Sequence, residues 1–355
     1  MRVVVVGASG NIGTSVLAAL AGEPEVDSVL GLARRRPDAQ FPKTEWAEAN
    51  VQHDDLEPHF RGADAVVHLA WAIQPSRDLA ALRRTNVLGS ERVFQAAAAA
   101  GVPAVVHGSS VGVYSTGPKD RAVDESWPRD GISTSFYGRH KAEVEKLLDR
   151  FETERPGIRV VRLRPGLVFK RDAGEGIRRL FLGPLMPSGL ARAGLVPLVP
   201  NVPGLRFQAV HSLDVGEAYR LAIVGQARGA FNVAAEPVLD GPALAELLDA
   251  RAVRVSPGLL RGAAGLTWRL RLQPSPAGWI DLALGVPLMD VSRARSELGW
   301  EPRWSAAEAF LDLMQGIRER RGSPTPPLAP ESSGPARSRE VATGVGQIDN
   351  ADRGG

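Results

Sequence analysis

The sequence predicts an α/β fold with a doubly wound parallel sheet and a smaller C-terminal lobe. Val3–Val6 form an unbroken β-branched run, which suits a strand buried on both faces of a parallel sheet. Gly7, Gly10 and Gly13 follow this run, and a helical pattern begins at Ser15. Further short apolar runs alternate with helical patterns over the first half of the chain, as βαβ units require.

The glycine segment has the order of elements that holds a dinucleotide pyrophosphate: strand, tight turn, helix. Gly7 permits the turn, Gly10 lets the backbone approach the phosphates, and Gly13 lets the helix pack closely against the strand. The free amides at the start of the helix and the positive end of its dipole then face the anion. The residues between these glycines are expected to take part in cofactor binding, namely Ser9, Asn11 and Ile12.

Composition excludes several classes of site. Hydrophobic residues make up 44% of the 355 residues, which is enough for a large core, and there is no cysteine for disulfides or thiolate metal sites. The six histidines show no metal-ligand spacing, and the net charge of +3 is too small to indicate nucleic-acid binding. No stretch reaches the roughly 18 apolar residues of a spanning helix. We therefore expect a soluble cytoplasmic protein that uses no metal and binds neither nucleic acid nor membrane.

A second motif lies in the middle of the chain. Tyr137 and Lys141 are four residues apart, so both side chains lie on one face of a predicted helix, and Ser110 precedes Tyr137 by 27 residues. Together with the Gly-x-x-Gly-x-x-Gly spacing, this pattern resembles the extended short-chain dehydrogenase/reductase family, also called the epimerase/dehydratase family. The resemblance covers about residues 1–320 and implies a Rossmann-type fold with a C-terminal substrate lobe.

The resemblance also implies roles for these three residues. Tyr137 would be the general acid/base, and a lysine ammonium beside it would bring its pKa down from about 10 towards working pH. Lys141 would also hold the nicotinamide ribose. Ser110, at the end of a strand over residues 104–107, would hydrogen-bond the substrate oxygen.

Further positions match the cofactor-contacting segments of the family. These are Asn50 and Val51 after the third strand, Leu69 and Ala70 after the fourth, and Pro165 and Val168 at and after the sixth. Asn50 stands where relatives commonly have Asp, and His140 stands where they have Ser. His68 is assigned no chemistry, while Trp71 is expected to face the cleft.

The end of the second strand bears on cofactor choice. NAD-preferring relatives have an acidic residue there, which binds the ribose 2′-hydroxyl. This chain has Arg34, whose guanidinium suits a 2′-phosphate. NADP is therefore favoured over NAD.

The resemblance divides the chain into parts. Residues 1–165 form the cofactor-binding core, with a re-entry at about 207–235, and residues 166–206 and 236–322 form the substrate lobe. Residues 323–355 are rich in Pro, Gly, Ser and scattered charge, and we expect a disordered tail.

The residues around the motif narrow the reaction. The 4,6-dehydratases of nucleotide sugars carry Asp-Glu where this chain has Val111 and Gly112. The lobe includes an apolar stretch at 195–200, which favours oxidation or reduction of a small or apolar carbonyl or alcohol substrate. One alternative is a nucleotide-sugar epimerase, in which Arg171, Arg178 and Arg179 would bind the diphosphate. A second alternative is a non-catalytic protein that senses NADP. The partner is a small-molecule substrate, and a homodimer is compatible with the resemblance.

Overall fold

The computed structural model describes residues 1–73, 77–182, 196–325 and 327–328. Its centre is a seven-stranded, wholly parallel sheet in the order β11-β7-β5-β4-β1-β2-β3. The strands are β1 (Arg2–Val6), β2 (Ser28–Ala33), β3 (Thr44–Glu48), β4 (Ala65–His68), β5 (Ala104–Gly108), β7 (Arg159–Pro165) and β11 (Gly229–Val233). The chain builds the sheet in two directions from its centre: from β1 through β2 to β3, and then from β4 through β5 and β7 to β11. The sheet is therefore doubly wound, as predicted.

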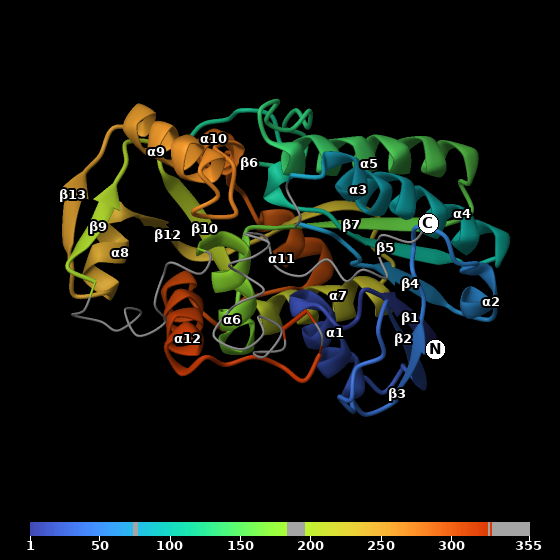
Figure 1. The fold of residues 1–355 in the computed structure, drawn as a ribbon. Coiled ribbons are helices and arrows are strands. Elements are labelled where there is room, and N and C mark those ends of the chain that lie inside the picture. Colours follow the sequence, from blue (N-terminus) through green and yellow to red (C-terminus); the bar gives the residue numbers. More distant parts are fainter. Residues whose placement is uncertain (74–76, 183–195, 326, 329–355) are drawn as a thin grey trace.

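Helices cover both faces of this sheet (Figure 1). One face carries α1 (Asn11–Ala21), α7 (Ser212–Val224) and α11 (Ser292–Leu298). The other face carries α2 (Glu57–Phe60), α4 (Gly89–Ala99) and α5 (Phe136–Glu154). The β-branched run explains this layering: Val3 and Val5 enter the first apolar cluster, while Val4 and Val6 enter the second.

The helix before α4 begins as α3 (Leu79–Arg83) and continues through one π-helical turn, Arg84–Leu88. Asn86 lies in that turn. Its side chain accepts a hydrogen bond from the Ala72 amide and donates one to the Ala72 carbonyl, both at 2.7 Å. The turn therefore fixes the segment that follows β4.

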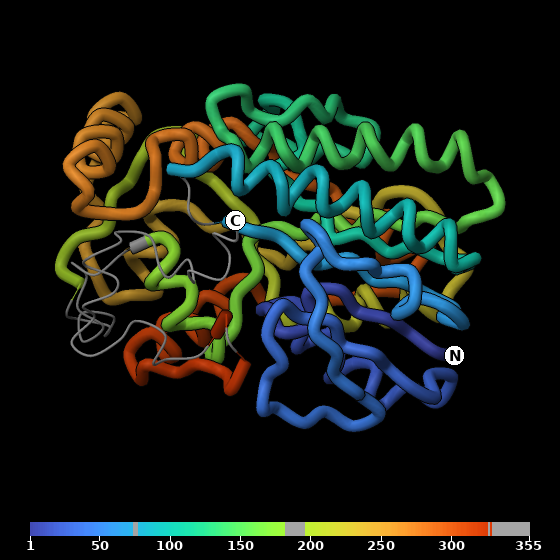
Figure 2. Tube along the Cα trace, turned by 45° about the vertical axis from the view of Figure 1, so that its right-hand side comes forward, coloured from blue at the N-terminus to red at the C-terminus, as the bar shows by residue number. Residues whose placement is uncertain are grey.

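The second lobe is built from small sheets and short helices (Figure 1). Figure 2 shows this lobe to the left of the first 70 residues, which are drawn in blue. Its sheets are β8 (Leu167–Phe169) with β10 (Arg206–His211) and β12 (Ala235–Asp240), then β9 (Leu198–Asn201) with β13 (Arg251–Arg254), and β6 (Ala122–Val123) with β14 (Leu288–Met289). Its helices are α6 (Gly174–Ile177), α8 (Gly241–Leu247), α9 (Pro257–Arg269), α10 (Gly278–Gly285) and α12 (Ala306–Glu319), with helical turns at Arg171–Ala173 and Arg178–Leu182. A further helical turn, Val111–Val113, follows β5 in the core and packs on α5.

The re-entry segment links the two lobes. Strand β10 belongs to the lobe sheet, but α7 packs on α1 and β11 forms one edge of the central sheet. Near the C-terminus, Thr325 and Leu328 are buried, and the Leu328 carbonyl accepts a hydrogen bond from the Ser323 amide. Packed structure thus reaches Leu328, beyond the expected tail boundary at Ser323. Residues 329–355 of that tail lie outside the described residues.

Candidate active site

The turn between β1 and α1 is tightly constrained. Gly7 has φ +85°, and a Cβ there would lie 2.6 Å from the Ala70 backbone nitrogen. A Cβ on Gly13 would lie 2.5 Å from the Gly7 carbonyl oxygen. Only glycine fits either position. The glycine turn therefore runs directly beside Leu69 and Ala70, which the resemblance implies as cofactor-contacting residues.

The start of α1 fits a bound anion. Its first turn holds no acidic residue, and Ser9 just before it is buried. Asn11 donates a hydrogen bond from Nδ2 to the Val168 carbonyl at 3.1 Å, while its buried Oδ1 has no partner among the described residues. Ile12 is half-buried behind it. The residues present thus fit a dinucleotide pyrophosphate, and the structure brings Asn11 and Val168, two of the predicted cofactor-binding residues, into contact.

The remaining predicted cofactor positions lie at or after the ends of strands of the central sheet. Arg34 is exposed directly after β2, and the Leu32 carbonyl of β2 accepts the amides of Gly7 and Ala8. Val51 is buried, and its side chain would meet a Cβ on Gly89 at 2.7 Å. Two further positions complete the set: Asn50, whose Oδ1 accepts the Gln52 amide at 3.0 Å, and Pro165, which is buried at the end of β7.

The structure brings the three candidate catalytic side chains together. Ser110 follows β5, and its Oγ accepts the Gly112 amide at 3.1 Å. A Cβ on Gly112 would lie 2.8 Å from the Tyr137 ring, so the turn after Ser110 packs directly on that ring. Tyr137 and Lys141 lie in the first turns of α5, whose N-terminus is capped by Ser135. The Lys141 ammonium donates to the Gly108 carbonyl at 2.6 Å.

Burial governs the protonation of these groups. It raises the pKa of Tyr137, and a hydrogen bond with the Ser110 side chain acts in the opposite direction. Burial also lowers the pKa of Lys141 to about 7, against the opposing charge of Glu145. Lys141 therefore changes charge near neutral pH, beside a phenol that the lysine charge would help to ionise.

Aromatic rings surround Tyr137. Trp71 contacts it edge-on at 5.9 Å between ring centres, and the Lys141 ammonium lies 3.5 Å from the Trp71 ring centre. On the other side, Trp279 of α10 lies 5.1 Å from the Tyr137 ring, and Phe181 lies 5.1 Å from Trp279. The indole N–H groups of Trp71 and Trp279 are buried without a hydrogen-bond partner among the described residues.

A buried polar network lies behind the three side chains. Glu145, one turn after Lys141, is fully buried and accepts hydrogen bonds from Ser109 Oγ at 2.5 Å and Arg164 Nε at 2.8 Å. Burial raises the pKa of Glu145, but hydrogen bonds from Arg164 and its charge outweigh that effect and lower it overall. Arg164 also donates to the Tyr114 hydroxyl at 3.0 Å. The network joins β5, α5 and β7 directly behind the candidate catalytic residues.

The sequence analysis did not identify two candidate functional residues, Glu145 and Lys170. Glu145 continues the four-residue spacing of Tyr137 and Lys141 along α5, so that spacing could have identified it. Lys170 is the second. Its ammonium is buried and donates to the Asn11 carbonyl at 2.9 Å and to Thr14 Oγ1 at 2.6 Å. Burial lowers the pKa of Lys170 to about 8. No sequence pattern marks this contact between β8 and α1.

The arginines proposed for a diphosphate have protein partners. Arg178 is buried and binds Glu175 with a shortest N–O distance of 2.9 Å. Arg171 Nε donates to Glu319 at 3.0 Å, and Arg179 donates to the Pro327 carbonyl at 2.8 Å. A ligand would have to displace these contacts.

His68 lies at the end of β4 and is fully buried. Its Nε2 lies 2.7 Å from Ser90 Oγ, and burial lowers its pKa to about 3. The imidazole is therefore neutral across the physiological range and packs as part of the core. Among the residues that the structure covers, no group of acidic or histidine side chains could hold a metal ion.

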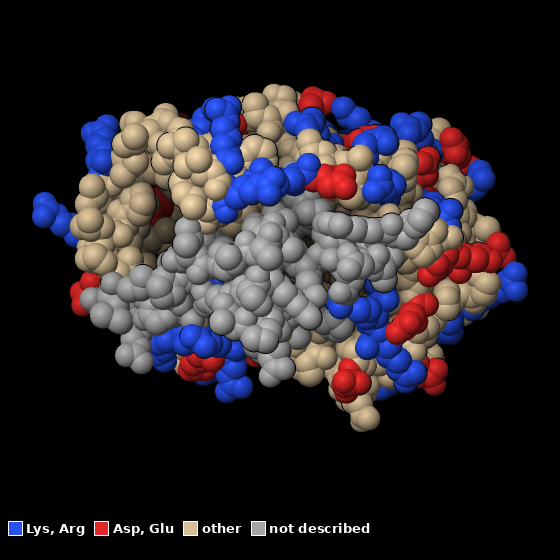
Figure 3. Space-filling model, viewed as in Figure 1, with Lys and Arg blue, Asp and Glu red and all other residues tan. Residues whose placement is uncertain are grey.

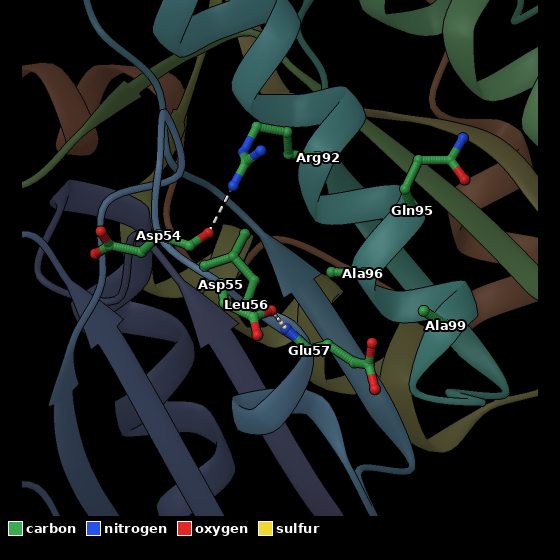
Figure 4. A pocket seen from close by; sticks show the side chains of 8 residues that line it. All are labelled: Asp54, Asp55, Leu56, Glu57, Arg92, Gln95, Ala96 and Ala99. Carbon is green, nitrogen blue, oxygen red and sulfur yellow. Dashed lines mark hydrogen bonds between the residues drawn. The ribbon is translucent and has the colours of Figure 1, made fainter.

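A pocket of about 280 Å³ lies elsewhere, between the segment Asp54–Glu57 and α4 (Figure 4). Arg92 reaches across it and donates to the Asp54 carbonyl at 2.7 Å. It contains none of the candidate site residues.

No helix within the described ranges is long and apolar enough to span a bilayer.

Comparison with known proteins identifies the family of the chain. The model of the NAD dependent epimerase/dehydratase family matches residues 3–234. The uncharacterized protein Rv0501 of Mycobacterium tuberculosis is 30% identical over 338 residues, covering 88% of this chain and 83% of that protein. A second uncharacterized protein of that species, Rv2047c, is 26% identical over 325 residues, and the chain spans only 31% of its length.

Two further matches have described activities. A 4-hydroxy-2-methyl-3-oxo-4-farnesyl-3,4-dihydroquinoline-1-oxide ketoreductase of Stigmatella aurantiaca is 31% identical over 176 residues, 48% of this chain and 52% of that enzyme. The dTDP-glucose 4,6-dehydratase of Streptomyces venezuelae, solved with NAD bound, has a similar structure with a TM-score of 0.67 and 21% identity, over 90% of this chain and 97% of that one. By sequence and by fold, the chain belongs to the NAD-dependent epimerase/dehydratase family.

Proposed function

We propose that the protein is an NAD(P)-dependent oxidoreductase that interconverts a carbonyl and an alcohol on a small or apolar substrate, using Ser110, Tyr137 and Lys141. The observation that carries this proposal is the convergence of three side chains from two separate elements. The Ser110 turn packs on the Tyr137 ring, and the Lys141 ammonium lies 5.8 Å from that ring's centre. The function is inferred from these three side chains because one fold can serve many unrelated activities.

Each residue has a defined task in the reduction direction. Ser110 Oγ donates a hydrogen bond to the substrate carbonyl oxygen and holds it beside Tyr137. Tyr137 Oη donates the proton that this oxygen gains. The Lys141 ammonium stabilises the phenolate left behind, which lowers the barrier to that transfer. A nicotinamide, when bound, supplies the hydride that the carbonyl carbon gains. The glycine turn and the start of α1 would hold its pyrophosphate.

Arg34 supports NADP as the cofactor. It is exposed at the carboxyl end of β2, and the same strand bonds the glycine turn through Leu32. A guanidinium there can bind a 2′-phosphate through two N–H groups. No acidic side chain occupies this strand end to bind a 2′-hydroxyl instead.

The surroundings of Tyr137 support an apolar substrate. Trp71 and Trp279 present apolar ring surface, and their N–H groups, which have no partner within the described ranges, match one or two acceptor oxygens. Arg171 and Arg178 already bind carboxylates, so a diphosphate would have to compete with Glu319 and Glu175. The sequence match to a ketoreductase with a farnesylated substrate points the same way.

The test is a screen of the purified protein with NADPH and NADH against apolar ketones, aldehydes and nucleotide sugars, following cofactor absorbance. The proposal expects turnover of an apolar carbonyl compound and none of UDP or dTDP sugars. The epimerase alternative is checked by calorimetry with nucleotide diphosphates. Micromolar binding that disappears in Arg178→Ala would establish that alternative and refute the apolar substrate.

A further inference from the structure

Helix α9 is an amphipathic surface element with no buried residue. Leu259, Leu266 and Leu270 are 66%, 59% and 60% exposed. Their spacing of seven and four residues puts them on one side of the helix. Single exposed leucines are ordinary, but of the eleven large exposed apolar residues in the described part of the chain, five fall between Val253 and Leu272. Exposed apolar side chains of the described residues are therefore concentrated in and around this helix.

The same segment is strongly basic. Between Asp249 and Asp281 the sequence contains no acidic residue and five arginines, all of them exposed: Arg251, Arg254, Arg261, Arg269 and Arg271. Arg261 pairs with Asp281 at 2.7 Å. Figure 1 places α9 and β13 at one corner of the molecule. In Figure 3, which has the same view, that corner is uncharged surface bordered mainly by basic side chains.

We propose that α9 and its flanking arginines, residues 251–272, form a docking surface for an anionic lipid bilayer, with the leucines in the interfacial region and the arginines on lipid phosphates. Leucine on one side and Arg on its margins is the composition of helices that lie in a membrane surface. Each Arg near an anionic leaflet contributes about 1 kcal/mol, and a short apolar stripe supplies the rest.

Charge excludes the other simple occupant. A second copy of the chain would place the same patch against itself in a two-fold dimer, which would bring two sets of five arginines together, and among the described residues only Arg261 of each set is paired with a carboxylate, Asp281. A lipid surface presents negative charge and apolar volume together. This inference departs from the sequence expectation that no membrane takes part, and it concerns surface attachment rather than a spanning helix.

The patch is connected to the candidate active site. α9 packs on α10, and α10 carries Trp279 against Tyr137. Arg77, on the segment after β4, stacks on Trp268 at 4.3 Å and donates to its carbonyl. Attachment through α9 would hold the aromatic side of the site close to the bilayer. The surface itself does not depend on which reaction the site performs.

The experiment is sedimentation of the full-length protein with vesicles of phosphatidylcholine alone and of phosphatidylcholine with phosphatidylglycerol. The variants are Leu259→Ser/Leu266→Ser and Arg254→Gln/Arg269→Gln/Arg271→Gln. Leu311→Ser, which changes an exposed leucine on α12, is the matched control. Melting curves establish that each variant is folded.

We expect binding to the anionic vesicles only. It should weaken about fivefold per arginine removed, so roughly a hundredfold in the triple variant, and should be lost in the leucine variant but kept in the control. Equal or absent binding to both vesicle types would overturn the proposal, as would variants that bind like the parent protein. A dimer in solution that dissociates in Leu259→Ser/Leu266→Ser would assign the surface to a second copy instead.

Discussion

Arginine has opposite roles in the two halves of the molecule. In β7, Arg159, Arg162 and Arg164 are all buried. Arg159 donates to the Ala222 and Ile223 carbonyls at the end of α7, and Arg164 binds Glu145. In the lobe, the arginines of β13 and α9 are exposed, and of these only Arg261 forms an ion pair among the described residues, with Asp281 of α10. The same side chain fixes structure in one half and presents charge to the surroundings in the other.

The two groups of arginines differ in their hydrogen-bonding and ionic partners, and these partners decide whether the side chain can be buried. A buried guanidinium is tolerated only when hydrogen bonds, or hydrogen bonds together with a carboxylate, replace its hydration. In β7 those partners come from α5 and α7, so the arginines connect the helices to the sheet. We therefore expect single changes in the buried network to affect folding or turnover strongly, and single changes in the exposed lobe to affect neither.

The largest effect should come from the candidate proton donor. Tyr137→Phe removes one oxygen while leaving the ring packed against Trp71 and Trp279, so the fold and the cofactor affinity should be retained. Turnover should fall by about 10² to 10⁴-fold, the usual contribution of a positioned acid/base. Steady-state rates and NADPH fluorescence titration measure the two quantities. A Phe variant with most of its activity would remove Tyr137 from the mechanism.

Next in size is the loss of the buried carboxylate. Glu145→Ala leaves Arg164 buried without its partner, which should lower the free energy of unfolding by about 3 to 5 kcal/mol. Urea denaturation measures it. Glu154→Ala, at the exposed end of the same helix, is the matched control and should change stability by less than about 0.5 kcal/mol. Equal losses in both variants would show that burial of the pair does not matter.

Cofactor choice should depend on one exposed residue. Arg34→Ala should weaken NADPH binding by roughly ten- to a hundredfold and leave NADH binding nearly unchanged, since one charge-assisted phosphate contact contributes about 1.5 to 3 kcal/mol. Titration of both cofactors against both proteins provides the comparison. If the parent protein binds NADH as tightly as NADPH, Arg34 does not select the phosphate.

The packed part of the C-terminus gives a smaller effect. Deletion from Glu331 should leave the melting temperature unchanged. Deletion from Ser323 removes buried Thr325 and Leu328 and should lower it by roughly 2 to 4 °C. Calorimetry of the two truncations separates them. Identical melting temperatures would mean that residues 323–328 contribute no stability.

The smallest expected effect is a shift in pH dependence. Glu145 raises the pKa of Lys141, against the burial that lowers it to about 7. Glu145→Gln keeps the shape but removes the charge, so the pKa of Lys141 should fall further. The protonated lysine that favours the Tyr137 phenolate is then lost at lower pH. The alkaline limb of kcat/KM that reports Lys141 should move to lower pH; a shift to higher pH would contradict this coupling.

Local patterns made much of this architecture predictable. The four valines of β1 and the three glycines after them act through neighbouring backbone, so the sequence alone indicates strand, turn and helix. The spacing of Tyr137 and Lys141 likewise places both on one helical face. The structure then brings Ser110 to the Tyr137 ring, and their catalytic roles remain predictions.

The rest depends on contacts between segments distant in sequence. Trp279 reaches Tyr137 from α10, and Lys170 reaches α1 from the end of β8. The sequence offers Arg178 as a diphosphate ligand, whereas the structure pairs it with Glu175, three residues away, as a buried ion pair. No periodicity reveals which charges will be buried together, because tertiary packing decides it.

The central claim is net redox chemistry at Tyr137, and one isotope measurement tests it most directly. The protein is incubated with NADPH deuterated at the transferable C4 position and the apolar carbonyl compound that gives turnover, and the product is analysed by mass spectrometry. We predict one deuterium on the carbinol carbon for each NADPH consumed, and no product with Tyr137→Phe. A product with no deuterium and no net consumption of NADPH would contradict the account.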